Sequence, residues 1–333
     1  MMKKINFVYP ILAFVLLTIS SCKKEDDGVV SFPLRDRAEE AQVANAEITT
    51  YLETHFYNYE EFANPDADFD YRIKFDTIAG DNASKAPLMD QVSSKIVTDR
   101  EEENITYTLY YLSVIEGEGK QVNFPDIVTL SYEGRLLSNN SLFDSSVNPV
   151  RFDLTQVING FQDGLKEFKT ATNIIENEDG TVTYENYGVG AVFIPSGIGY
   201  FSNSPSFALP AYSQLIFTFQ VYATQNGDQD DDGVPSIFED LNNNDLEEDD
   251  DTDGDFVPNY ADNDDDNDGR LTKNEIETNE YMLNEGDPEP TLAENEVEVD
   301  RVYDAENNTT VISTVVFTDV DNDGVPNYLD KDN

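Results

Sequence analysis

The chain has no tryptophan, one cysteine, one histidine and few basic residues. A single cysteine excludes an internal disulfide, and His55 has no suitable partners nearby for a metal site built on histidine or cysteine. Residues 170–269 contain no lysine or arginine at all, so phosphates would be repelled and nucleic-acid binding is disfavoured. These absences turn attention to acidic and apolar side chains.

Acidic residues dominate the composition: Asp and Glu number 68 against 20 Lys and Arg, a formal charge of -48. Such a chain repels itself unless its charge is solvated or neutralised by bound cations. Residues 228–268 hold 19 acidic residues and no basic one, too polar a composition to form a hydrocarbon core. This segment is predicted to need a metal in order to fold, with calcium as the natural counter-ion.

Four twelve-residue segments place carboxylates at positions 1, 3, 5 and 12, the spacing of an EF-hand calcium loop. The third is the most complete, because Gly269 supplies the turn at position 6 and the Arg270 carbonyl stands at position 7. In the second, Phe256 replaces that glycine and makes the tight turn harder. The predicted ligands are Asp228, Asp230, Asp232 and Glu239; Asp251, Asp253, Asp255 and Asp262; Asp264, Asp266, Asp268, Arg270 and Glu275; and Asp319, Asp321, Asp323 and Asp330.

The recurring Val-Pro-Asn-Tyr and Asp-x-Asp-x-Asp-Gly motifs resemble thrombospondin type-3-like calcium repeats. The resemblance covers residues 228–275 and 319–332, interrupted by a Glu-rich insert at 276–318. It implies a stalk with little regular structure, in which calcium replaces the hydrophobic core. One alternative is an acidic solubilising tail. Another, a regulatory EF-hand sensor, requires paired flanking helices, and Val-Pro-Asn-Tyr is a poor helix start.

The first 21 residues read as an export signal, with Lys3 and Lys4 before an apolar run at 8–19 that is too short to span a bilayer. Ile19-Ser-Ser-Cys22 resembles a bacterial lipobox, which implies lipidation of Cys22 and attachment to a membrane. The alternative is a plain secretory signal with an incidental cysteine. Residues 22–35 form a tether whose charged start resembles the export tag of Bacteroidota lipoproteins. We therefore predict an outer-membrane lipoprotein, either periplasmic or surface-exposed.

The remaining chain divides by composition. Residues 36–100 are predicted as a helical region, because Asp36 to Phe56 has an amphipathic pattern that Asn64-Pro65 ends. Residues 101–225 contain short alternating apolar runs, typical of an antiparallel sheet, and one short helix near 157–168. Residues 226–333 form the acidic segment. The predicted fold class is α+β.

Within the sheet region, several motifs occur in a fixed order. They are Tyr132-Glu-Gly-Arg-Leu, Leu142-Phe-Asp-Ser-Ser, Pro149, Phe152-Asp-Leu, Val157-Ile-Asn-Gly-Phe-Gln-Asp-Gly-Leu165, Phe193-Ile-Pro-Ser-Gly-Ile-Gly-Tyr200, Leu209-Pro and Leu215-Ile-Phe217. Together they resemble the FKBP-type peptidyl-prolyl isomerases. That resemblance implies a curved antiparallel sheet wrapped over one short helix, no cofactor for catalysis, and proline-containing polypeptides as substrates.

The resemblance also implies a pocket for the proline. Phe161 would form its floor, and Asp144 and the Tyr200 hydroxyl would be its polar groups. Its walls would be Tyr132, Phe143, Val157, Ile158, Leu209 and Phe217. Such a pocket needs no acid, base or nucleophile, because rotation about an X-Pro bond breaks only amide resonance, a barrier of ~18–20 kcal/mol.

Three departures from the family pattern leave the function open. Phe161 takes the floor position because the chain has no tryptophan, Val150 stands where an aromatic wall is usual, and 170–190 is an insertion beside a pocket strand. One reading is a lipid-anchored isomerase that assists folding of exported proteins. A second is a catalytically weak module that binds proline-containing segments from a calcium stalk. A third is purely structural, with the sheet as a cap on the calcium segment.

Overall fold

The computed structural model describes residues 34–102, 104–177, 179–244, 246–304 and 307–332. The predicted signal peptide and Cys22 lie outside these ranges, so the lipobox stays a prediction. Among the helices that are described, none is long and apolar enough to cross a bilayer.

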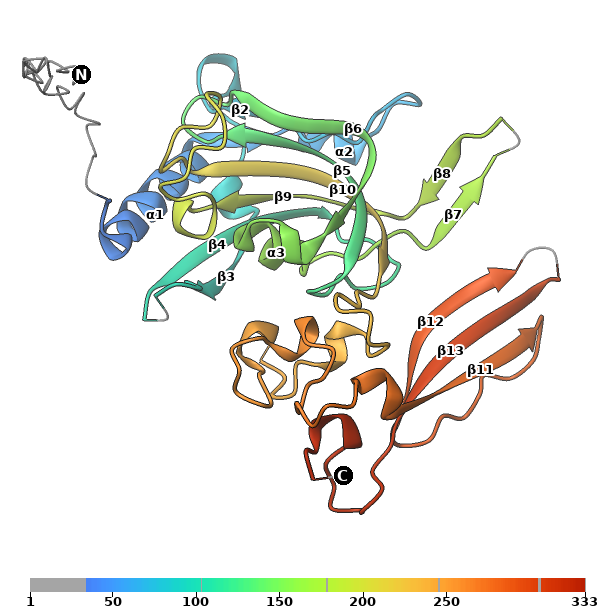
Figure 1. The fold of residues 1–333 in the computed structure, drawn as a ribbon. Coiled ribbons are helices and arrows are strands. Elements are labelled where there is room, and N and C mark those ends of the chain that lie inside the picture. Colours follow the sequence, from blue (N-terminus) through green and yellow to red (C-terminus); the bar gives the residue numbers. More distant parts are fainter. Residues whose placement is uncertain (1–33, 103, 178, 245, 305–306, 333) are drawn as a thin grey trace, which may run out of the picture. The chain divides into compact units, whose positions relative to one another are not determined.

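A six-stranded antiparallel sheet is the centre of the fold (Figure 1). Its strand order is β3-β4-β9-β10-β5-β6, and every neighbouring pair is antiparallel. Its strands are β3 (Ser93–Thr98), β4 (Thr106–Ile115), β5 (Ile127–Leu136), β6 (Leu142–Asp153), β9 (Gly188–Ile194) and β10 (Leu215–Gln225). The central strands β9 and β10 are buried over most of their length, and neighbouring residues such as Val192 and Phe193, or Leu215 and Ile216, enter two different cores.

One face of the sheet packs against the short helix α3 (Asn159–Leu165), which follows the turn η3 (Leu154–Gln156). Two glycines let the helix lie directly on β9. A Cβ added to Gly160 would come within 2.5 Å of Ile194, and one added to Gly164 within 2.3 Å of Val192. The core on this face gathers the apolar side of α3 and alternate residues of β10, including Phe217 and Phe219. The short helix predicted near 157–168 is present.

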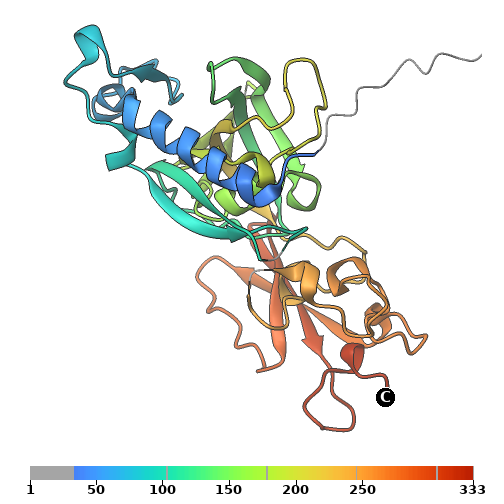
Figure 2. The same cartoon turned by 90° about the vertical axis from the view of Figure 1, so that its left-hand side faces the viewer.

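The opposite face is covered by α1 (Arg37–Thr54), seen along its length in Figure 2. Asp36 begins the helix by accepting the N–H of Glu39 (2.9 Å). Ile48 and Leu52 are fully buried against residues such as Phe193 of β9, which points away from α3. The predicted amphipathic helix therefore supplies a second core.

The rest of the region predicted as helical is mixed. It holds β1 (His55–Tyr57), α2 (Tyr59–Ala63), β2 (Phe75–Thr77) and the turns η1 (Gly80–Asn82) and η2 (Leu88–Asp90), with β1 paired to β2. It also holds β3, which pairs with β4 from Ser93 to Thr98. The boundary predicted between residues 100 and 101 therefore passes between two paired strands, and the N-terminal region contributes to the sheet.

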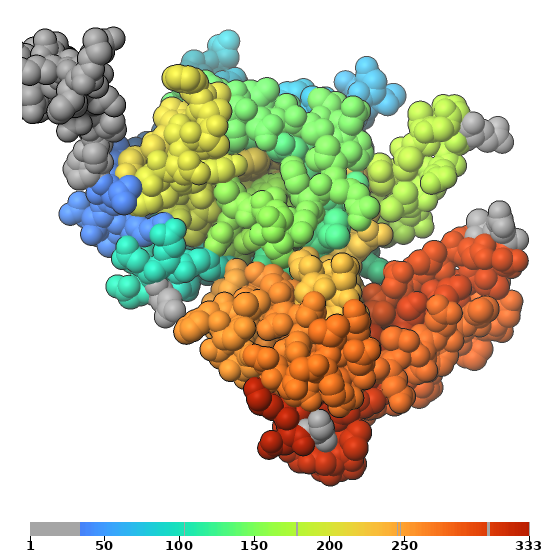
Figure 3. Space-filling view, viewed as in Figure 1, coloured from blue at the N-terminus to red at the C-terminus, as the bar shows by residue number. Residues whose placement is uncertain are grey.

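The insertion at 170–190 forms a hairpin of β7 (Asn173–Glu176) and β8 (Val182–Glu185), which stands out from the sheet (Figure 3). Tyr184 stacks on Tyr222 of β10 with ring centroids 4.3 Å apart. Tyr222 in turn bonds to Ser131 (3.0 Å), whose neighbour Tyr132 joins the α3-side core. Because side chains alternate along a strand, the hairpin is held on the face away from α3.

The acidic segment contains more regular structure than predicted. The insert folds as a three-stranded antiparallel sheet of β11 (Ile276–Asn284), β12 (Glu296–Asp304) and β13 (Thr309–Phe317), in the order β11-β13-β12. The apolar run at 311–317 forms its central strand, with Ile312 and Val315 buried. The acidic segment outside the insert contains short 3₁₀ turns: η5 (Ser236–Phe238), η6 (Glu247–Asp249), η7 (Asn259–Ala261), η8 (Thr272–Asn274) and η9 (Asn327–Leu329). A further 3₁₀ turn, η4 (Ser196–Ile198), lies in the sheet domain.

Candidate functional site

Five aromatic rings from four elements meet on the α3 side of the sheet. We call Tyr132, Phe143, Phe152, Phe161 and Phe217 the aromatic cluster. Phe161 of α3 and Phe217 of β10 lie at its centre, with ring centroids 4.9 Å apart and exposed fractions of 3% and 6%. Phe143 meets Phe217 edge to face at 5.6 Å. Tyr132 lies between Phe152 (5.2 Å) and Phe217 (6.3 Å).

Gly134 of β5 makes this packing possible. A Cβ built at that position would approach Phe143 Cζ to 2.7 Å and Phe217 Cε1 to 2.9 Å. Both distances are shorter than packed carbon atoms tolerate. The glycine of the Tyr132-Glu-Gly-Arg-Leu motif therefore gives the two rings their contact with the backbone of β5.

The polar side of the cluster is a hydrogen bond between Tyr132 and Asp144. The Tyr132 hydroxyl donates to Asp144 Oδ2 over 2.7 Å. Burial, then the bond to Asp144, raises the pKa of Tyr132. Burial also raises the pKa of Tyr200, and the Asp144 charge adds to the shift. Both phenols thus stay protonated at neutral pH, and Asp144 faces them from an exposed position on β6.

The structure brings the other predicted pocket residues to the same core. Leu209 is buried in it, while Val157, Ile158 and Tyr200 are partly buried and pack against it. Phe152 is an addition that the predicted site did not include. It contacts Tyr132 and Phe161 (6.3 Å), and it lies two residues from Val150 on the same strand. The alternation of β6 was the available signal, because residues 150 and 152 share a face.

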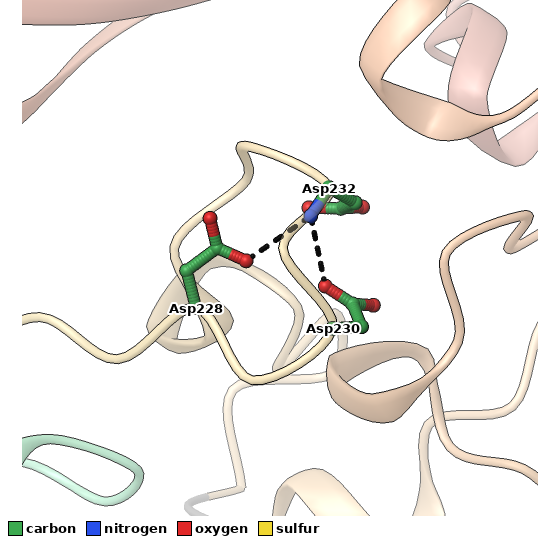
Figure 4. Close-up of side chains that lie close together, drawn as sticks. All are labelled: Asp228, Asp230 and Asp232. Atoms are coloured by element: carbon green, nitrogen blue, oxygen red, sulfur yellow. Dashed lines mark hydrogen bonds between the residues drawn. The ribbon is translucent and has the colours of Figure 1, made fainter.

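The acidic loops at 228–239, 251–262, 264–275 and 319–330 are called the first to fourth loops. In each one, carboxylate oxygens from positions 1, 3 and 5 lie within 4.8 Å of one another. Figure 4 shows the first trio, in which the Asp232 N–H points to both Asp228 and Asp230 (3.2 Å each). Among the carboxylate groups found in the described residues, one includes a position-12 carboxylate, and it joins Glu239 to Asp232 and Asp265 rather than to Asp228 and Asp230.

The backbone repeats from loop to loop. Position 6 has a positive φ in all four, with 96° at Gly233, 95° at Gly269, 99° at Gly324 and 77° at Phe256. Phe256 thus adopts the turn that glycine makes elsewhere, and its N–H donates to Asp251 Oδ2 (2.9 Å) as the Gly324 N–H does to Asp319 (3.0 Å). The second loop gathers its trio despite the missing glycine.

The side chains at position 12 of the four loops differ from one another in their partners and burial. Glu275 pairs with the Arg270 side chain (3.0 Å), Asp262 accepts the N–H of Asp264 (3.0 Å), and Asp330 accepts that of Asp332 (3.0 Å). Glu239 is fully buried.

The donor set fits a hard cation. It consists of carboxylates, which suit calcium, and the trios contain no nitrogen or sulfur ligand. Burial, followed by the charge of Asp232, raises the pKa of Asp230 to about 8. Unneutralised carboxylates are therefore unfavourable here, and a divalent cation would remove that cost.

With this geometry described, the comparisons with known proteins identify the class of the sheet domain. Residues 118–222 match the family of FKBP-type peptidyl-prolyl cis-trans isomerases, so this segment is an FKBP-type domain. It contains the aromatic cluster and Asp144. The match begins after β3 and β4, which complete the sheet from outside it.

A curated relative has the same family name. The chain is 35% identical over 112 residues to the "Probable FKBP-type peptidyl-prolyl cis-trans isomerase FkpA" of Neisseria meningitidis serogroup B (strain ATCC BAA-335 / MC58). That alignment covers 33% of this chain and 35% of the relative, so the chain spans about a third of the relative's length.

Two solved structures are also similar. A peptidyl-prolyl cis-trans isomerase from Pseudomonas syringae pv. tomato str. DC3000 aligns at 22% identity and a TM-score of 0.29, covering 35% of this chain and 74% of that one. FkpA from Escherichia coli aligns at 20% identity and a TM-score of 0.30, covering 56% of this chain and 63% of that one.

A different family matches the acidic segment. Residues 229–298 match the family described as BamM C-terminal, which spans the first three loops and part of the insert. The resemblance to thrombospondin type-3 repeats is not confirmed by this match, and calcium binding stays a prediction.

Proposed function

We propose that the protein is a peptidyl-prolyl cis-trans isomerase acting on proline-containing segments of other polypeptides. The observation that carries the proposal is the aromatic cluster within the FKBP-type segment, with the Tyr132–Asp144 bond at its edge. Phe161 and Phe217 offer an apolar floor, and Tyr132, Phe143 and Tyr200 offer partly buried walls.

Catalysis of rotation about the X-Pro bond would depend on the apolar surface of the cluster and on the Tyr200 hydroxyl. A planar X-Pro amide has more charge separation than a twisted one, so a dry apolar surface favours the twisted state relative to water. Tyr200 stays protonated and can donate to a substrate carbonyl. Asp144 accepts from Tyr132 and fixes the ring that forms one wall. Each of these groups positions or desolvates the bond, and none takes or gives a proton.

A catalytically weak binding module is the second candidate. It is favoured by Val150, which gives a smaller wall than an aromatic ring would, and by Phe161 at the floor. Phe152 offsets part of that loss, because its ring lies beside Tyr132.

Exchange NMR of an Ala-Leu-Pro-Phe peptide with the full chain separates the two candidates. We expect acceleration that falls by about tenfold or more in Phe143→Ala, equivalent to roughly 1.4 kcal/mol of barrier. Tyr200→Phe should cost about fivefold, the worth of one hydrogen bond. Tyr303→Ala is the matched control, since this exposed ring of β12 is outside the FKBP-type segment. If the folded chain does not accelerate the exchange, isomerase activity is rejected and the binding module is the remaining candidate.

We also propose export and lipid attachment at Cys22, on the strength of the signal-like segment and lipobox at the N-terminus. The FKBP-type relative and the BamM match support a role in the cell envelope. A palmitate analogue with a clickable alkyne should label the chain in cells, and Cys22→Ser should abolish the label. Equal labelling of the unaltered chain and Cys22→Ser would reject lipid attachment at Cys22.

Finally, we propose that calcium binds the four acidic loops. The repeated trios and their all-oxygen ligands support this. Calorimetric titration of the full chain, stripped of metal with EDTA, should show calcium binding. A titration with no heat of binding would reject the proposal that the loops bind calcium.

A further inference from the structure

A fifth carboxylate cluster joins two loops that the sequence treats as separate sites. Oxygens of Asp232, Glu239 and Asp265 lie within 4.8 Å of one another. Asp232 and Glu239 come from the first loop and Asp265 from the third. All three side chains are inside the protein, with exposed fractions of 1%, 0% and 1%. We call this cluster the bridging site.

Each member has at least one buried oxygen without a hydrogen-bond partner among the described residues. Asp232 Oδ1 accepts the N–H of Val234 (2.7 Å), but its Oδ2 has no partner among the described residues. Asp265 Oδ2 accepts the Thr272 hydroxyl, whereas its Oδ1 is likewise unsatisfied. The bound oxygens hold the two aspartates in place and leave the other two oxygens available.

Glu239 is the strongest indication of a ligand. Both of its carboxylate oxygens are buried without a hydrogen-bond donor in the described part of the chain. The nearby Ser236 hydroxyl donates instead to Gln229 Oε1 (2.6 Å). A buried carboxylate without donors is strongly unfavourable unless a cation is present.

No side-chain cation supplies that charge. None of the three residues forms an ion pair within the described ranges, and Arg270, a basic residue of the third loop, pairs with Glu275 (3.0 Å). In their ionised form, three carboxylates this close together therefore require a positive charge from outside the chain.

We propose that the bridging site binds a calcium ion of its own and shares Asp232 with the ion of the first trio. Asp228, Asp230 and one side of Asp232 hold the first ion, while Asp232, Glu239 and Asp265 hold the second. Glu239 is thus a ligand between loops rather than the closing ligand of the first loop. Asp265 occupies position 2, which the EF-hand pattern does not use.

The chemistry of the site selects among divalent cations. Its three ligands are carboxylates, so the site lacks the nitrogen and sulfur donors that zinc and copper favour. Magnesium keeps several of its waters, and side chains exposed by 1% or less leave little access for them. Calcium accepts more protein oxygens at flexible distances and fits best.

The bridging ion would fasten the first loop to the third. Residues 239 and 265 are separated by the whole second loop, so no local hydrogen-bond pattern brings them together. A shared aspartate makes the two ions depend on each other, because the first trio positions Asp232 for the second ion.

Counting bound ions tests the proposal, which rests on calcium binding by the loops. Full-length chains are stripped with EDTA, loaded with calcium and measured by native mass spectrometry and calorimetry. Asp265→Asn and Glu239→Gln should each bind one ion fewer than the unaltered chain, and the double variant should lose no more than either alone. Asp231→Asn should bind the full number, since Asp231 is exposed and belongs to none of the carboxylate clusters.

The outcomes distinguish the two proposals. If the unaltered chain binds no calcium, the loops fail as calcium sites and the bridging site fails with them. If it binds calcium but Asp265→Asn matches Asp231→Asn, only the bridging site is rejected. Should Asp265→Asn not fold, crystals of the unaltered chain with a lanthanide decide. An anomalous peak between the three carboxylates supports the proposal, and its absence beside occupied trios overturns it.

Discussion

Gly134 shows how one missing side chain organises the candidate pocket. Replacing it with alanine would place a methyl group 2.7 Å from Phe143 Cζ and 2.9 Å from Phe217 Cε1. We expect Gly134→Ala to lower the free energy of unfolding by about 1–3 kcal/mol, because rings in a packed core cannot move aside freely. Isomerase activity should fall as well. Urea denaturation and exchange NMR measure the two effects.

A second substitution provides the control for this prediction. In Gly134→Ala/Phe143→Leu the smaller leucine removes one of the two close contacts, so part of the lost stability should return. Activity should stay low, since Phe143 is a pocket wall. Equal stability of Gly134→Ala and the unaltered chain would show that the rings have room.

Two buried tyrosines, Tyr51 of α1 and Tyr107 of β4, differ in the hydrogen bonding of their hydroxyl groups. The Tyr51 hydroxyl has no hydrogen-bond partner among the described residues, whereas the Tyr107 hydroxyl donates to Asp99 (2.8 Å). At pH 8, Tyr51→Phe should leave stability unchanged or raise it by about 1 kcal/mol, and Tyr107→Phe should cost about 1–3 kcal/mol. The reverse order in urea denaturation would contradict the assigned contacts.

At alkaline pH, the free energy of unfolding of Tyr51→Phe should differ from that of the unaltered chain. Burial raises the pKa of Tyr51, so the unfolded chain gives up this proton first, near pH 10. Stability is therefore present below pH 10 and lost above it, by up to ~1.4 kcal/mol per pH unit for one group. Tyr51→Phe should lose less stability than the unaltered chain between pH 10 and 11.

At this scale the sequence predicted residue types better than contacts. The ordered motifs placed nine residues in one pocket, and all nine contribute to or border the α3-side core. Phe152 stands among the ordered motifs but was not assigned to the pocket, because its role depends on which way β6 faces, and strand pairing sets that direction. Asp265 was missed because a loop pattern read along the chain contains no information on contacts between loops.

Among the elements, the β7–β8 hairpin gives a direct prediction. Its Tyr184 stacks on Tyr222, which faces away from α3. Replacing residues 173–185 with a short Gly-Asn turn should therefore leave peptide isomerisation within about twofold of the unaltered chain. A tenfold loss would mean that the hairpin extends the substrate groove. Circular dichroism serves as the folding control.

Element boundaries were predicted less well than elements. The N-terminal amphipathic helix and the helix near 157–168 are present, because their periodicity is local. Strand β3 was assigned to the helical region, since only its pairing with β4 shows where it belongs. The sequence left open whether the insert folds, although the apolar run at 311–317 was suited to pairing, because only the pairing of its Glu- and Thr-rich strands buries Ile312 and Val315.

For the whole molecule, calcium removal should act on one part of the chain. The two cores of the six-stranded sheet are hydrocarbon, whereas the loops gather carboxylates. EDTA should therefore expose residues beyond 226 to protease and leave the sheet domain resistant. Limited proteolysis and circular dichroism measure this, with calcium addition as the reversal. Uniform resistance in EDTA would contradict the prediction.

The ends of the three-stranded insert lie next to each other. Ile276 pairs with Phe317, and the Thr318 hydroxyl donates to the Glu275 carbonyl, so the chain leaves the third loop and returns beside it. The insert is thus a cassette whose two ends meet between two consecutive repeats. Evolution or an engineer can exchange it for another domain with closely spaced termini and keep the repeats on both sides, which makes residues 275 and 318 a natural grafting point for displayed proteins.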